Sequence, residues 1–531
     1  MKKDETFDRI RKFVPNSASG QAASRRRFLK TGSGLAAGAA IAPFLSEQAS
    51  AQSANRRAAN DGDLLARLQR QSRDPQGRIL IKNGSIVTMD PQVGDFAKGD
   101  LLIEGTKISK IAPSIDVKAE VFDATDMILI PGFADTHRHC WQNQLRRIVP
   151  NVDGGNYTTI FHQFFAPFYR PEDMYAGNYI SALGCIDAGV TCLMDWSHNA
   201  RTAAHSDAAI QALLDSGIRA VHGYGAPLFG NWDHQHPKDF ERLRTKYFSS
   251  TDQLVTICIA TLAFVDWKYD DIKFARDHGL RMTIDGFAGN PQNMDDFVQR
   301  GLLGPDMTYI HCTHISDNAW RKVKETGGCV GMAPTSDTQL GLGPSIVPVQ
   351  KALDFGIRPG LSCDVEIALP TDFFTEMRVA LCFQHSDVYN RAYNKVPNPP
   401  PAITARDVLE FATVQGAKGN GLLDKCGSIT PGKEADIVLL TANEINNMPV
   451  NNVIGTVVNG CDTRNVDTVI IGGTVRKFRG KLVDVDIEKV RRIVHQSRDA
   501  LIARSGYQLD IFSEKTQGEI PAGASLPTQR L

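Results

Sequence analysis

Short apolar runs alternate with segments of helical periodicity through the middle of this chain, and few folds accommodate that pattern. The segment 207–214 is typical of the helical stretches. A strand followed by a crossover, repeated eight times, predicts a (β/α)8 TIM-like barrel. A doubly wound open sheet is the competing α/β fold, but no Gly-rich phosphate loop follows the first strand. The eight predicted strands are residues 127–135, 190–196, 218–224, 254–260, 280–287, 308–312, 329–333 and 359–364.

A second β-rich region is divided between the two ends of the chain. Residues 78–126 contain several strand-like runs with turns at Asn83-Gly84 and Glu104-Gly105, and strand-like runs return at 435–440 and 468–473. We therefore expect residues 78–129 and 425–485 to form one small composite β-sandwich and 130–424 to form the barrel. Residues 486–531 are expected to be a C-terminal helix and tail.

The first 51 residues have the pattern of a twin-arginine signal peptide. Residues 24–30 read Ser-Arg-Arg-Arg-Phe-Leu-Lys, a weakly apolar stretch follows at 31–45, and Ala49-Ser50-Ala51 is a small-x-small cleavage site. This predicts a periplasmic or secreted protein that engages the twin-arginine export machinery. No apolar run reaches the ~20 residues of a bilayer span, so no membrane anchor is expected after export. Residues 52–77 are predicted to be a linker or a short surface helix.

Composition narrows the class of partner. The 531 residues carry 59 basic and 59 acidic side chains with 42% apolar residues, which suits a globular enzyme and argues against a nucleic-acid partner held by counterion release. Ten cysteines are scattered without a CxxC pair, so we expect mostly buried thiols. The expected partners are a small-molecule substrate and further copies of the chain in a homo-oligomer.

Four side chains at the predicted strand ends have the chemistry of a metal site. His137 and His139 follow the first apolar run at i, i+2, which points both imidazoles to one side of the strand. His311 ends the sixth strand and Asp364 the eighth. Barrel active sites gather at these carboxyl ends, so the sequence predicts a mononuclear divalent site that binds Zn first, with Mn, Fe or Co as alternatives.

These residues, with Pro131-Gly132 before the histidines and the stretch 427–436 (Gly-Ser-Ile-Thr-Pro-Gly-Lys-Glu-Ala-Asp), resemble the amidohydrolase superfamily. The likeness is to the branch of cytosine, guanine and S-adenosylhomocysteine deaminases and triazine hydrolases, over residues 78–485. It implies that His137 and His139 bind the metal. Asp364 would touch the metal and take a proton from the attacking water, and His311 would hydrogen-bond the water or the substrate.

The fifth strand departs from the family pattern. Asp285 stands where the family places a metal-binding histidine, and Ala288 stands where the deaminases carry a glutamate. An aspartate also ligates zinc, so a site of two histidines, Asp285 and Asp364 is one expectation, and more carboxylate favours harder ions. Loss of the ligand, with a weak or absent metal, is the other. No lysine ends the fourth strand at 258–262, which disfavours a carbamylated-lysine dinuclear centre.

Without that glutamate, we expect hydrolysis of a non-peptide C–N bond, such as an amide, urea or carbamate, in a small cyclic or aromatic molecule. Deamination of a heterocyclic amidine is the alternative, and a metal-poor binding barrel without catalysis is the alternative from another class. Trp141, Gln142, His198 and His314 are candidate substrate contacts. The aromatic segment 157–169 is either a lid over an apolar pocket or part of the helical core or a subunit contact.

Overall fold

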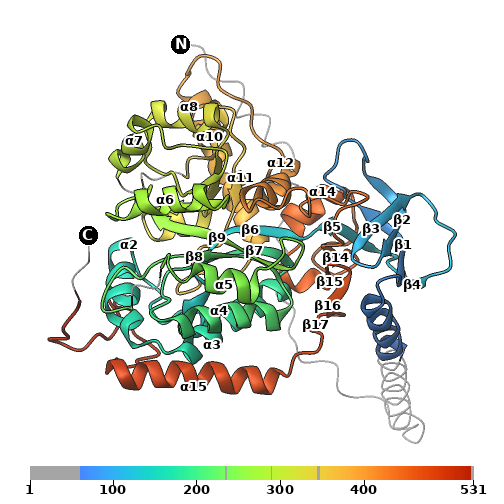
Figure 1. The fold of residues 1–531 in the computed structure, drawn as a ribbon. Helices are drawn as coiled ribbons and strands as arrows, with labels where there is room; N and C mark the ends of the chain where they lie inside the picture. The colour runs from blue at the N-terminus through green and yellow to red at the C-terminus, as the bar shows by residue number, and fades with distance from the viewer. Residues whose placement is uncertain (1–59, 234–235, 289, 344–346, 528–531) are drawn as a thin grey trace, which may run out of the picture. The chain divides into compact units, whose positions relative to one another are not determined.

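The computed structural model describes residues 60–233, 236–288, 290–343 and 347–527 (Figure 1). The predicted signal peptide, 1–51, and the first part of the predicted linker lie outside these residues. The remainder of the linker segment is helical over 60–73. Among the residues that the structure describes, no helix has the length and apolar character needed to cross a membrane.

Eight parallel strands form the predicted barrel, and their order in the sheet is their order in the chain. Every predicted run overlaps one of them, so the (β/α)8 architecture is confirmed. The strands are nearly all buried because helices cover the outside, as expected for a parallel sheet. They are β6 (Phe133–Arg138), β7 (Val190–Ser197), β8 (Arg219–Tyr224), β9 (Val255–Leu262), β10 (Met282–Asp285), β11 (Met307–Ile310), β12 (Cys329–Met332) and β13 (Gly360–Leu361).

Helices follow the strands and pack their apolar faces on the barrel. In α8, for example, Ser316 accepts a hydrogen bond from the Ala319 amide at the N-terminus, and Gly327 ends the helix in the left-handed conformation with φ 77°. Ala319, Trp320 and Val323 form its buried stripe. The main helices are α3 (Pro171–Asp187), α4 (Ala203–Ser216), α5 (Phe240–Tyr247), α6 (Lys268–Asp277), α7 (Pro291–Gln299), α8 (Asp317–Thr326), α10 (Val349–Asp354), α11 (Phe373–Tyr393) and α12 (Ala405–Glu410).

Both ends of the chain contribute to a separate nine-stranded mixed sheet, as the sequence predicted. Antiparallel pairing of β5 with β14, which places Leu129 opposite Leu439, joins the N-terminal strands to the C-terminal ones. The strands are β1 (Arg78–Ile86), β2 (Phe96–Glu104), β3 (Lys107–Ala112), β4 (Glu120–Asp123), β5 (Met127–Pro131), β14 (Ile437–Thr441), β15 (Val466–Ile471), β16 (Thr474–Phe478) and β17 (Lys481–Leu482).

The first predicted strand is divided between the two sheets. β5 belongs to the mixed sheet and β6 to the barrel, and Gly132 stands between them. A Cβ at Gly132 would lie 2.0 Å from Oγ1 of Thr191 on β7. Only glycine therefore lets the chain pass this close to β7. Periodicity did not reveal the division because both halves are apolar and buried.

Backbone hydrogen bonds join the first and last barrel strands beyond the end of β13. The His139 amide donates to the Asp364 carbonyl at 3.0 Å, and the Asp364 amide donates to the His137 carbonyl at 3.1 Å. Thr136 Oγ1 adds a bond to the Leu361 carbonyl at 3.0 Å. The barrel thus closes at the residues predicted to bind metal.

The C-terminal segment forms α15 (Ile487–Ser505), which lies alongside α3 in Figure 1. Ser497 Oγ donates to Oδ1 of the buried Asp173 at 2.8 Å, and Arg504 Nη2 donates to Oδ2 of the same carboxylate at 2.6 Å. All ten cysteines are free thiols, and only Cys382 is exposed. The prediction of mostly buried thiols is confirmed.

Replacement of Gly132 by alanine tests the passage between the two sheets. Because the new methyl group would overlap Thr191, we expect G132A to lower the free energy of unfolding by about 1–3 kcal/mol. A Cβ at Gly62 meets nothing within 4 Å, so G62A, at a helical position, should be neutral or slightly stabilising. Denaturant unfolding of both variants measures the difference, and equal stabilities would contradict this account.

Candidate metal centre and active site

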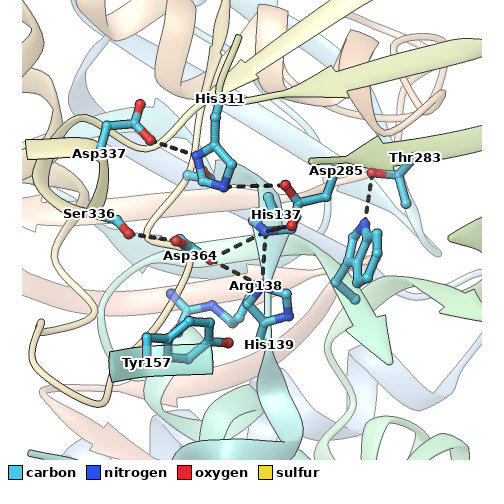
Figure 2. Close-up of polar contacts among 12 residues, drawn as sticks. His137, Arg138, His139, Tyr157, Thr283, Asp285, His311, Ser336, Asp337 and Asp364 are labelled. Carbon is cyan, nitrogen blue, oxygen red and sulfur yellow. Dashed lines mark hydrogen bonds and ion pairs between the residues drawn. The ribbon is translucent and has the colours of Figure 1, made fainter. Parts of the chain in front are cut away.

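Three side chains meet at the closure of the barrel (Figure 2). The Nε2 atoms of His137 and His139 lie 3.1 Å apart, and each lies 3.2 Å from Oδ1 of Asp364. All three residues are buried. Ligand atoms about 2.0–2.1 Å from one tetrahedral ion lie roughly 3.3 Å apart, so the triangle has the size that a single ion requires.

The chemistry of these atoms also fits a divalent ion. Asp364 Oδ1 is buried and accepts no hydrogen bond from any described residue, which is costly for a carboxylate oxygen unless a cation faces it. Two imidazole nitrogens and one carboxylate oxygen are ligand types that zinc prefers. His137, His139 and Asp364 are therefore suited to hold one ion, and the predicted residues are brought together.

Asp285 and His311 stand beside this triangle at longer distances. Asp285 Oδ2 lies 3.9 Å from His137 Nε2, and Asp285 Oδ1 lies 3.7 Å from His311 Nε2. Together with His137 they form a second, looser group of potential ligands. The Asp285 side chain keeps 17% of its surface exposed, whereas the triangle is almost fully buried. Asp285 thus faces the cavity from the edge of the site.

His311 has a partner that sequence reasoning missed. Its Nδ1 lies 2.6 Å from Oδ1 of Asp337, a buried residue of α9 (Pro334–Gln339). Burial by itself lowers the pKa of the His311 imidazole, but the Asp337 carboxylate outweighs it and raises that pKa to about 10. His311 also has a left-handed backbone with φ 65°, as does Asp364 with φ 56°. Such strained positions cluster at functional sites.

α9 also supports Asp364. Ser336 Oγ donates to Asp364 Oδ2 at 2.5 Å (Figure 2), which leaves Oδ1 to face the two histidines. Thr335, the preceding residue, donates from its amide to Glu376 Oε2 at 3.1 Å and from its hydroxyl to Oε1. No local signal in the sequence marks Ser336 or Asp337, because their partners lie 28 and 26 residues away.

A cavity of about 230 Å³ opens beside the metal triangle. It is smaller than the roughly 300–1,000 Å³ of pockets that hold drug-sized ligands, so it suits a molecule of one or two rings. No lysine or arginine stands among the described residues that line it. One wall is apolar (Leu228, Phe229, Leu262, Phe264, Leu340 and Leu342) and the polar wall comprises His139, Tyr157, His162, His198, Asp285, His311 and Asp364.

The four candidate substrate contacts have different positions. His198 lines the cavity, and its Nδ1 must donate to the Trp196 carbonyl at 3.0 Å, which leaves Nε2 as an acceptor. Trp141 and Gln142 are fully buried behind the lining, where the Gln142 amide donates to Tyr157 Oη at 2.7 Å. His314 is exposed and does not line the cavity.

Part of the aromatic segment 157–169 lines the cavity, and the rest belongs to a buried core. Tyr157, at the end of α2 (Gly154–Tyr157), and His162, in the π-helix Thr158–Phe165, line the cavity. The remaining aromatic side chains form a separate buried cluster, among them Phe161, Phe164, Phe165 and Tyr169. Burial lowers the pKa of the His162 imidazole to about 3, so this ring is neutral at physiological pH.

Comparison with known proteins places the chain in a family. Residues 128–476 match the model of the amidohydrolase family, and the chain belongs to that family. It is 26% identical over 447 residues to the 5'-deoxyadenosine deaminase of Methanobrevibacter smithii, covering 80% of this chain and 98% of that protein. It is 28% identical to the 5-methylthioadenosine/S-adenosylhomocysteine deaminase of Thermococcus kodakarensis, over 75% of this chain and 93% of that one.

Solved structures share the fold. An adenosine deaminase from Xanthomonas campestris with bound zinc has a TM-score of 0.68 and 19% identity, over 81% of this chain and all of that one. Atrazine chlorohydrolase from Arthrobacter aurescens, complexed with zinc, has a TM-score of 0.65 and 20% identity, over 80% of this chain and all of that one. With the family match and the metal triangle, the chain is a metal-dependent hydrolase that acts on C–N bonds.

The buried carboxyl group of Glu376, which accepts hydrogen bonds from Thr335 of α9, is predicted to make the stability of the fold depend on pH. Burial raises the pKa of its carboxyl from the usual 4.5 to about 8, against the opposing hydrogen bonds from Thr335. The unfolded chain ionises Glu376 above pH 4.5 while the folded chain keeps it protonated, so folding loses stability as the pH rises from about 4.5 to 8. Glu376→Gln, which mimics the protonated acid, should therefore gain in Tm over wild type across this range, with a constant difference above it. A pH-independent difference would contradict the assignment.

Proposed function

We propose that this protein hydrolyses the exocyclic C–N bond of a small, neutral nitrogen heterocycle and releases ammonia. The observation that carries the proposal is the triangle of His137, His139 and Asp364, which opens onto a small cavity whose described lining residues include no lysine or arginine. The relatives named as deaminases support this reaction over amide, urea or carbamate hydrolysis, which the sequence alone had favoured.

The residues of the metal triangle, Asp285 and His311 each have a part in the proposed reaction. His137, His139 and Asp364 would hold a divalent ion, which would lower the pKa of water toward ~7. Water adds to the ring carbon that bears the amino group, and Asp364 takes its proton and passes it to the departing nitrogen as the C–N bond breaks. Asp285 or His311, which face the same space, donates a proton to the ring nitrogen during addition. The second proton of the water replaces it when the carbonyl forms, so the product ring keeps its N–H and the amine leaves as ammonia.

The lining selects the substrate class. The described lining residues include two carboxylates and no lysine or arginine, and the imidazolium of His311 is already paired with Asp337. A phosphorylated or carboxylated molecule would therefore be buried there without a free counter-charge. His198 Nε2 offers an acceptor for an N–H group of the ring. The apolar wall, which includes Phe229 and Phe264, suits alkyl or unsubstituted ring edges.

Ala288 favours a second candidate function. It lines the cavity where the family resemblance expects the deaminase glutamate, and a ring nitrogen therefore finds no carboxylic acid at that point. Hydrolysis of an amide, urea or carbamate, which needs no proton on a ring nitrogen, is the second candidate. The third expectation, a metal-poor binding barrel, rested on Asp285. The three atoms of the metal triangle meet without it, and this argues against that reading.

A substrate screen distinguishes the two hydrolytic reactions. The full-length protein loaded with Zn²⁺ should release ammonia from neutral aminopyrimidines, aminotriazines or aminopurines. The corresponding nucleotides should be at least 100-fold poorer substrates because their phosphate meets two carboxylates and no unpaired cationic side chain among the described lining residues. Ammonia assays and chromatography of the products measure both. Turnover of carbamates or anilides without ammonia release from any heterocycle would establish the second candidate instead.

Asparagine substitutions separate the two aspartates. Asp364→Asn removes one corner of the metal triangle, so it should abolish both stoichiometric Zn²⁺ binding and turnover. Asp285→Asn lies outside the triangle, so it should retain about one Zn²⁺ per chain while turnover falls roughly 100- to 10,000-fold, as expected for loss of a proton carrier. Metal analysis of the dialysed proteins is the measurement. Loss of Zn²⁺ from Asp285→Asn would make Asp285 a ligand and refute its proposed role.

A further inference from the structure

A buried arginine lies between the two metal-binding histidines in sequence. Arg138 is 1% exposed, and Figure 2 shows its side chain together with those of His137, His139 and Asp364. Its Nε donates to Asp135 Oδ2 at 2.9 Å, and its Nη1 donates to Glu366 Oε1 at 2.8 Å. The guanidinium is planar and donates to a carboxylate from each of two nitrogens. It therefore connects β6 to the segment after β13 as a rigid unit.

Each of the two carboxylates that Arg138 joins lies two residues in the sequence from a proposed metal ligand. Asp135 precedes His137 by two residues on β6, and Glu366 follows Asp364 by two residues beyond β13. Every proposed ligand is therefore within two residues of a member of this bridge. We call Asp135, Arg138 and Glu366 the buried bridge.

Glu366 is held on several sides. It is 2% exposed and accepts hydrogen bonds from Asn143 Nδ2 at 2.8 Å, Arg146 Nη2 at 3.0 Å and Thr371 Oγ1 at 2.5 Å, in addition to Arg138. Thr371 Oγ1 in turn lies 3.2 Å from Arg138 Nη1. The carboxylate has little freedom to move, so it fixes the position of the arginine and of the strand that carries it.

The histidines have no comparable support of their own. In metal sites the second nitrogen of a ligating histidine usually donates to a carboxylate, a carbonyl or water. Here the Nδ1 atoms of His137 and His139 are buried and meet no hydrogen-bond partner among the described residues. Both rings pack edge-on against Trp196, with centroids 5.7 Å apart. Their positions otherwise depend on the backbone of residues 137–139 and on the contacts that hold this backbone against the loop of Asp364.

We propose that Arg138 and Glu366 are positioning residues that set the spacing of the three metal ligands, and that metal affinity depends on their bridge. The two backbone bonds between His137, His139 and Asp364 bring the strands together. The buried bridge keeps the two segments in that register through its side-chain contacts. This inference concerns metal binding itself and stands whether or not the proposed substrate class is right.

Metal affinity of bridge variants tests the proposal without reference to activity. Glu366→Gln in the full-length protein should weaken Zn²⁺ binding at least 10-fold in competition with a chromogenic chelator, the loss typical of a disturbed outer shell. The visible absorption of bound Co²⁺ should change as well, because it reports coordination geometry. Unchanged affinity and an unchanged Co²⁺ spectrum would overturn the proposal.

Asp436→Asn is the matched control. Asp436 accepts from Arg219 Nε at 2.7 Å in an equally buried pair, at 1% and 3% side-chain exposure, and none of the metal ligands belongs to that pair. It should lose stability as Glu366→Gln does and keep its Zn²⁺ affinity within about twofold. Equal weakening of Zn²⁺ binding in both variants would reduce the bridge to a general structural role and refute the proposal.

Two milder substitutions keep the test decisive if Glu366→Gln does not fold. Thr371→Val removes one donor to Glu366 and one contact to Arg138. The ion pair between Arg138 and Glu366 stays intact in this variant. Arg138→Lys keeps the charge but lacks the fork that reaches both carboxylates. Both should bind Zn²⁺ more weakly than wild type, with the larger loss in Arg138→Lys. Wild-type affinity in both would overturn the proposal.

Discussion

Two backbone hydrogen bonds, between His139 and Asp364 and between Asp364 and His137, are the constraint on which the site depends. They close the eight-stranded barrel, and they do so at the residues whose side chains meet at 3.1–3.2 Å. The left-handed backbone of Asp364, with φ 56°, is part of this arrangement. Barrel closure therefore provides a metal-sized triangle of ligand atoms as a consequence of the fold, because the carboxyl ends of the strands converge there.

Buried charged residues that do not line the cavity lie close to that triangle in the structure. Arg138 and Glu366 bridge the strands behind the ligands, and Asp337 holds the imidazole of His311. Breaking a buried pair by removal of one partner leaves an uncompensated charge and is strongly destabilising. These contacts therefore restrict the site to one geometry. The cavity wall, in contrast, includes the neutral imidazole of His162 and a hydrogen-bond acceptor, Nε2 of His198.

This geometry explains how a member of the amidohydrolase family can carry Asp285 where the family resemblance expects a metal-binding histidine. The three closely spaced ligand atoms do not include Asp285, which lies at the edge of the cavity where a carboxylate can exchange protons with a substrate. The chain therefore keeps a metal centre while it changes one of the groups around it. Export by the twin-arginine route, which delivers folded proteins, remains a prediction, and it suits a protein that acquires its metal before it leaves the cytoplasm.

The sequence determined the eight strands, the sheet shared by both chain ends, and the convergence of His137, His139 and Asp364. Period-two alternation places i, i+2 side chains together, and parallel strands align their carboxyl ends. It named His314 as a candidate substrate contact, but His314 is exposed and outside the cavity lining, because the left-handed φ of 65° and 53° at His311 and Cys312 redirects the chain there. Nor did it indicate Asp337, Ser336 or Glu366. Their contacts join segments that follow neighbouring strands of the barrel but lie far apart in the sequence. Only tertiary packing decides which side chains meet there.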